Sequence, residues 1–106
     1  MFSLFKKSDT ESILVNEIDN LIGKINLIDI REPEEVKFGT IKTAKNIPMG
    51  SLLNNPSQYL KKEESYYLMC QSGMRSGRTV AQLKKLGYKV INVKGGFGAY
   101  SGKFRQ

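Results

Sequence analysis

The chain has 106 residues, enough for one domain with a single modest core. Its 40% hydrophobic and 25% charged residues are ordinary for a globular protein and argue against wholesale disorder. The formal net charge is +7, but the basic residues are scattered and form no run longer than two, which favours a solvated basic surface over a nucleic-acid-binding patch.

Apolar runs and helical patterns alternate along the chain. In chain order the sequence predicts a strand at 12–15, a helical turn at 16–22, a strand at 25–30, a helix beginning at 33, a short strand at 44–47, one or two helical turns within 50–62, a strand at 66–70, a helix at 76–86 and a strand at 90–93. In the helix at 76–86, Val80, Leu83 and Leu86 share one face, and Gly87 provides the stop. This alternation predicts an α/β fold, with a mostly parallel central sheet of about five strands flanked by helices on both faces.

Chemically notable segments follow three of the predicted strands, at 29–31, 70–75 and 94–96. In α/β sheets ligands bind beyond the carboxyl ends of the strands. We therefore expect these three segments to form a common site.

The strand at 66–70 ends at Cys70, the only cysteine of the chain, and no histidine is present to activate it. Gly73 permits a positive φ, so the backbone can curl tightly and point successive N–H groups inward, next to a helix N-terminus. With Arg75 nearby, such a nest of donors favours a negative charge at its centre. The loop therefore predicts that Cys70 has a thiol pKa well below that of a free cysteine.

A lone cysteine at the end of an apolar strand is more commonly a small core residue. The glycine, the arginine and the immediate start of a helix favour a reactive thiolate here instead.

Four segments in order resemble the rhodanese (thiosulfate sulfurtransferase-like) family, in its single-domain form, over about 12–100. They are Leu27-Ile-Asp-Ile-Arg-Glu-Pro-Glu-Glu, Gly39-Thr-Ile-Lys-Thr-Ala-Lys-Asn-Ile-Pro48, the six-residue loop Cys70-Gln-Ser-Gly-Met-Arg75, and Val93-Lys-Gly-Gly-Phe. The second segment departs from the family pattern Gly-His-Ile-Pro-Gly-Ala-x-Asn-Ile-Pro, because Thr40 replaces the histidine and Lys42-Thr43 replaces Pro-Gly. Tyr100 stands where a tryptophan is common.

The resemblance implies a rhodanese-like fold in which Cys70 is the nucleophile and takes up a sulfane sulfur as a persulfide. It implies that the following loop residues cradle that sulfur and an anionic donor: Gln71, Ser72, Gly73, Met74 and Arg75. Ser76 is a supporting residue, and Asp29 and Arg31 are expected to form a structural pair near the site. No cofactor and no metal is expected.

The predicted function is transfer of a sulfane sulfur from an anionic donor such as thiosulfate to a thiol or to cyanide. The sulfur donor or acceptor can also be a protein. The acceptor must be external, since one cysteine offers no internal resolving thiol. One alternative is a persulfide carrier or partner-binding module with little turnover on small molecules. A weaker alternative is a cysteine phosphatase or arsenate reductase, whose loop generally places five residues between cysteine and arginine, against four here.

The remaining expectations concern location and boundaries. No apolar run approaches the roughly 20 residues of a membrane span, and the lysines of the N-terminus follow its apolar residues, unlike those of a signal peptide. We expect a cytoplasmic protein without membrane or nucleic-acid partners. Residues 1–11 are expected to be a mobile N-terminal extension, and 12–106 the rhodanese-like domain.

Overall fold

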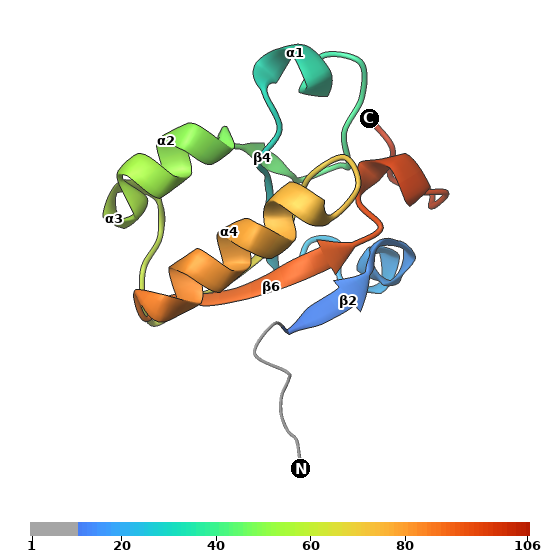
Figure 1. Ribbon diagram of the computed structural model, residues 1–106. Coiled ribbons are helices and arrows are strands. Elements are labelled where there is room, and N and C mark those ends of the chain that lie inside the picture. The colour runs from blue at the N-terminus through green and yellow to red at the C-terminus, as the bar shows by residue number, and fades with distance from the viewer. Residues whose placement is uncertain (1–10) are drawn as a thin grey trace.

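Five parallel strands form the centre of the structure, a computed structural model that describes residues 11–106 (Figure 1). Their order in the sheet is β2-β6-β5-β3-β4. The strands are β2 (Ser12–Leu14), β3 (Asn26–Asp29), β4 (Lys45–Asn46), β5 (Ser65–Met69) and β6 (Lys89–Lys94). The extension predicted at 1–11 lies outside the described residues except for Glu11, whose carbonyl accepts a hydrogen bond of 2.9 Å from the N–H of Asn92. No helix within 11–106 has the length and apolarity needed to cross a membrane.

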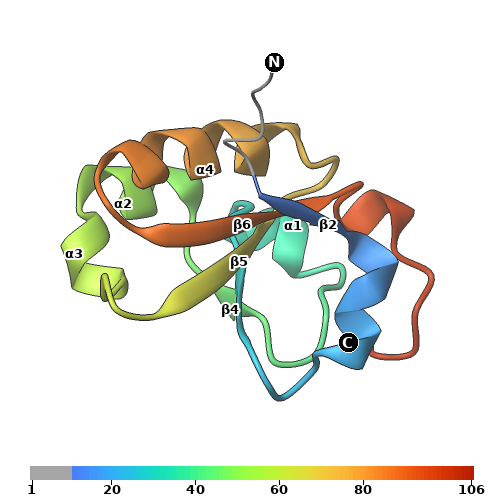
Figure 2. The same ribbon diagram turned by 90° about the horizontal axis from the view of Figure 1, so that it is seen from below.

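Helices cover both faces of the sheet (Figures 1 and 2). One face carries α2 (Met49–Asn54), α3 (Pro56–Tyr59) and α4 (Met74–Lys85), and the other carries the 3₁₀ helices η2 (Val15–Asn20) and η3 (Phe97–Ala99). A single turn, α1 (Pro33–Val36), follows β3. The predicted α/β architecture is confirmed, and the sheet is parallel throughout its described strand pairs.

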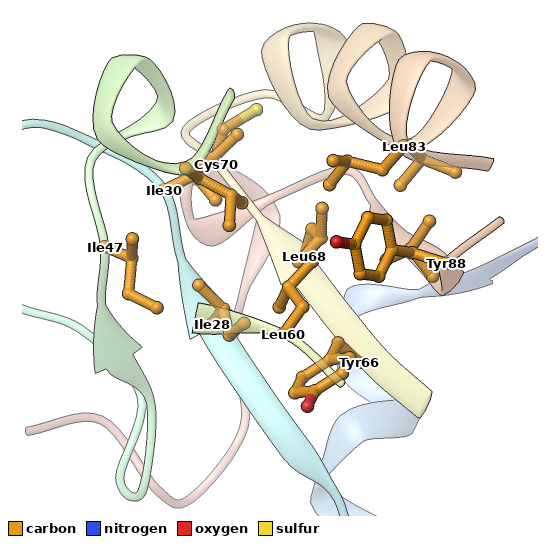
Figure 3. Close-up of a cluster of buried hydrophobic side chains, with 12 residues drawn as sticks. Ile28, Ile30, Ile47, Leu60, Tyr66, Leu68, Cys70, Leu83 and Tyr88 are labelled. Carbon is orange, nitrogen blue, oxygen red and sulfur yellow. The ribbon is translucent and has the colours of Figure 1, made fainter. Parts of the chain in front are cut away.

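Two buried clusters explain why the strands are apolar on both sides. Ile28 and Leu68 point to the face of α2 and α4, where Figure 3 shows them with Cys70 and Leu83. Their chain neighbours Leu27 and Met69 belong to the cluster under the 3₁₀ helices. Side chains alternate along a strand, so the central strands β3, β5 and β6 each supply apolar residues to both clusters.

The ends of α4 differ from the prediction. The helix begins at Met74, two residues before the expected start, because Gly73 takes φ +95° and caps it. At the other end Leu86 is the C-cap residue and is 53% exposed, so it does not share the buried face of Val80 and Leu83. The early start places Met74 and Arg75 of the predicted loop within the first turn of the helix.

Thr43 is the one described non-glycine residue with a positive φ, +74°. It stands where the family pattern has glycine, and a β-branched residue in this region costs about 1–3 kcal/mol. Glycine relieves this strain, but its greater conformational freedom in the unfolded chain offsets part of the gain, so we expect Thr43→Gly to raise the free energy of unfolding by about 1 kcal/mol.

Urea denaturation measures this change, with Thr43→Ala as the matched control. Alanine keeps the Cβ atom, and so most of the backbone penalty, and is expected to change stability little. A Thr43→Gly protein less stable than the wild type would show that the threonine side chain stabilises the turn by more than its backbone conformation costs.

Candidate active site

The carboxyl ends of β3, β5 and β6 bring the three notable segments together, as expected. Arg31, after β3, donates from Nη1 to Oε1 of Gln71 at 3.2 Å. The turn after β6 reaches the same loop, because the N–H of Phe97 donates to the carbonyl of Cys70 at 2.9 Å. The residues following β5 are thus bound on both sides by chain segments remote in sequence.

Three groups surround the sulfur of Cys70, which is buried. The N–H of Gly73 lies 3.1 Å from Sγ, the N–H of Ser76 lies 3.3 Å from it, and Oγ of Ser76 lies 3.3 Å away. The positive φ of Gly73 allows this curl, as the sequence predicts. The N–H donors converge on one atom, which is the arrangement that stabilises a thiolate.

Opposing effects set the pKa of Cys70. Burial raises the pKa of the thiol, but hydrogen bonds from the side chain and N–H of Ser76 and from the N–H groups of Gly73 and Ser72 outweigh it. The pKa therefore lies below the ordinary value for cysteine. This agrees with the predicted activation by the loop without a histidine.

Arg75 of the active loop pairs with a carboxylate that the sequence does not indicate. Its guanidinium donates to both carboxylate oxygens of Glu35, at 2.9 and 2.8 Å, and so turns toward α1. The bond to Arg75 lowers the pKa of Glu35 to about 2, so the pair stays ionised at neutral pH. The charge of Arg75 lies close enough to Cys70 for the two groups to interact, and its ion pair fastens the active loop to α1.

Asp29 and Arg31 form a fully buried ion pair with N–O distance 2.7 Å. The Asp29 carboxylate also accepts a bond of 2.8 Å from the hydroxyl of Thr40, the residue that replaces the family histidine. Arg31 donates to the carbonyl of Gly39 at 2.7 Å, and its guanidinium lies 4.6 Å from the ring centre of Phe97. These contacts fix the segments that surround the loop, in line with a structural role for Asp29 and Arg31.

The glycine turn after β6 forms the back of the site. Gly96 has φ +65°, and a Cβ atom there would lie 2.5 Å from the carbonyl oxygens of both Cys70 and Gln71. The N–H of Gly98 donates to the Gln71 carbonyl at 2.9 Å. Only glycine at position 96 allows this close approach of the two backbones.

The entrance to the site lies over the loop. Gln71, Ser72 and Met74 are exposed, while Cys70 itself has no exposed surface. A groove beside the loop, lined by Gly73, Met74 and Asn92, also carries the cationic side chains Arg78 and Lys94. This groove therefore carries two positive charges close to the loop.

Two residues of the site escaped the sequence analysis. The sequence indicates no role at the site for Glu35 or for Asn92. Asn92 accepts a bond of 2.5 Å from the Ser76 hydroxyl at its Oδ1. The available signal was one amide side chain within the apolar strand 90–93.

Comparisons with known proteins agree with this geometry. The family model of the rhodanese-like domain matches residues 14–103. A protein of Allochromatium vinosum named sulfurtransferase is 33% identical over 97 residues, covering 83% of this chain and 90% of that protein. YqhL of Bacillus subtilis is 40% identical over 83 residues, and the match covers 77% of this chain and 65% of YqhL, just under two thirds of its length. The crystal structure of a rhodanese-like domain protein from Staphylococcus aureus superposes with a TM-score of 0.81 at 32% identity, covering 92% of this chain and 97% of that one.

Proposed function

Since this chain belongs to the rhodanese-like domain family, we propose that it is a sulfurtransferase that carries a sulfane sulfur on Cys70 as a persulfide. The observation that carries the proposal is the convergence of the Gly73 and Ser76 N–H groups on the sulfur of Cys70. These donors favour the thiolate, which is the nucleophilic form of cysteine.

The first half of the reaction loads the protein. The Cys70 thiolate attacks the outer sulfur of a donor such as thiosulfate, so a new S–S bond forms while the bond between the outer sulfur and the sulfonate breaks. The electron pair of that bond leaves with sulfite. The negative charge passes to the terminal sulfur of the persulfide.

The second half unloads it. An external acceptor attacks the terminal sulfur, the persulfide bond breaks, and its electron pair returns to Cys70 as the thiolate. The acceptor must come from outside, because one cysteine provides no resolving thiol. Cyanide, a small thiol or a protein cysteine satisfies this requirement, and a protein partner would use the chain as a sulfur carrier.

The phosphatase alternative fits the site less well. Four residues separate Cys70 from Arg75, so the loop is one residue shorter than the one that surrounds a tetrahedral oxyanion. In addition, both Nη atoms of Arg75 already donate to Glu35. An arginine whose two Nη groups already donate to a carboxylate is poorly placed to bind phosphate.

We expect thiocyanate to form when the protein is incubated with thiosulfate and cyanide, and we expect Cys70→Ser to form none above the uncatalysed background. Colorimetric detection of thiocyanate measures this, with para-nitrophenyl phosphate hydrolysis run in parallel. Rapid hydrolysis of the phosphate ester without thiocyanate formation would overturn the assignment in favour of a phosphatase.

A further inference from the structure

The hydroxyl of Ser76 has two acceptors within reach but only one proton to donate. Its Oγ lies 3.3 Å from Sγ of Cys70 and 2.5 Å from Oδ1 of Asn92. The amide nitrogen of Asn92 donates to the carbonyl of Gly73 at 3.3 Å, which fixes the amide with its oxygen toward Ser76. Asn92 and Cys70 therefore compete for the same hydroxyl proton.

Which of the two groups accepts the hydroxyl hydrogen bond depends on the charge of the sulfur. When Cys70 is a neutral thiol, its S–H can donate to Oγ while the Ser76 hydroxyl donates to Asn92, so all three groups are bonded. When Cys70 is a thiolate, the hydroxyl must rotate toward the sulfur to stabilise it, and Oδ1 of Asn92 then loses its donor. A buried or half-buried acceptor without a donor costs free energy.

We propose that Asn92 is a positioning residue that competes with Cys70 for the Ser76 hydroxyl and thereby limits the stability of the thiolate. The backbone donors of Gly73 and Ser76 contact the sulfur in either arrangement. Asn92 thus determines how much the Ser76 hydroxyl stabilises the thiolate beyond what these backbone donors provide. The fraction of Cys70 that is ionised at a given pH depends on that stabilisation.

The charged groups around Cys70 are separate from this competition. Arg75 of α4 is paired with Glu35 of α1, and Arg31 is paired with Asp29 at the end of β3. Lys94 stands at the end of β6, where its Cα lies near Gly73, and α2, which packs on the same side, has no charged residue. Uncharged substitutions at Asn92 leave all of these ion pairs in place.

The competition has a consequence for sulfur transfer, which rests on the proposed function. In the persulfide, Sγ carries neither a proton nor the negative charge, so the Ser76 hydroxyl has no reason to leave Asn92. The Ser76–Asn92 hydrogen bond is kept in the loaded protein, whereas the empty thiolate draws the hydroxyl away from Asn92. Asn92 therefore favours the loaded form over the empty thiolate.

The test uses the rate of alkylation of Cys70 by iodoacetamide, measured across pH on the full chain. Below the pKa of the thiol the rate follows the fraction of thiolate. Asn92→Leu removes the competing acceptor, so the rate there should rise roughly three- to tenfold, the factor for one hydrogen bond. Asn92→Asp keeps the acceptor and adds a negative charge, so its rate should fall below that of the wild type.

Both variants lose the amide bond to Gly73, so that loss cannot explain shifts in opposite directions. A double-mutant cycle gives the sharper control. In a Ser76→Ala background no hydroxyl remains to compete for, and Asn92→Leu should then leave the rate within about twofold. Should Asn92→Leu fail to fold, Asn92→Val serves as the strand-compatible substitute.

An unchanged or slower rate for Asn92→Leu in the wild-type background overturns the proposal. Equal acceleration with and without the Ser76 hydroxyl overturns it as well, since the effect would then come from a displaced loop. Alkylation involves no sulfur transfer, so these outcomes are independent of the thiocyanate assay. Absence of thiocyanate would reject the proposed function while leaving the role of Asn92 open to this test.

Discussion

Replacing Gly96 by alanine should displace the active loop and reduce sulfur transfer at least tenfold, a loss of about 1.4 kcal/mol or more of transition-state stabilisation. The added Cβ atom would lie 2.5 Å from the carbonyl oxygens of Cys70 and Gln71, so one of the two backbones must move. A φ of +65° adds backbone strain for any residue with a Cβ atom. We expect the free energy of unfolding to fall by about 3 kcal/mol from the two effects together.

Gly50→Ala is the matched control. Position 50 lies within α2 with no atom within 4 Å of an added Cβ, and alanine favours a helix, so stability should stay equal or rise slightly. Urea denaturation and the thiocyanate assay measure both variants. Wild-type activity and stability in Gly96→Ala would show that the glycine turn does not fix the position of the Cys70 loop.

Much of the site could be predicted because its features are local in sequence. Cys70, Gly73 and the following helix lie within a few residues of one another, so a strand, a positive φ and a helix N-terminus already imply converging N–H groups. The parallel sheet was predictable for a similar reason, since apolar runs alternate with helical patterns. The carboxyl ends of parallel strands then meet at one edge.

Contacts between distant segments could not be predicted in the same way. The pairing of Arg75 with Glu35 joins residues 40 apart in the chain, whereas the sequence indicates only that Arg75 lies near Cys70. Ser76 and Asn92 are 16 residues apart and meet only because β6 lies beside β5 under α4. Which of two acceptors takes a hydroxyl proton is decided by side-chain geometry that sequence does not record.

The start of α4 shows the same limit on a smaller scale. Gly73 was correctly predicted to adopt a positive φ, but its role as the residue that caps the helix moves the boundary to Met74. Local pattern identified the helix and its buried residues Val80 and Leu83. The boundary depended on how the loop folds back onto the sulfur.

The largest effect is expected for Cys70→Ser, which should remove sulfur loading entirely. Serine keeps the approximate size of the side chain and the surrounding donors of Gly73 and Ser76, so the fold should be retained. A hydroxyl with an unshifted pKa is not ionised at neutral pH and cannot attack a sulfane sulfur as the thiolate does. The variant therefore separates the chemistry of the sulfur atom from the shape of the loop.

Intact-mass spectrometry of the wild type and Cys70→Ser after incubation with thiosulfate tests the central claim, that Cys70 carries a sulfane sulfur, most directly. The wild-type chain should gain about 32 Da, the mass of one sulfur atom in a persulfide, and should lose it again on addition of cyanide. Cys70→Ser should keep its mass throughout. A wild-type mass that does not change with thiosulfate or with other sulfane donors would contradict the account, and Cys70 would then be a structural cysteine.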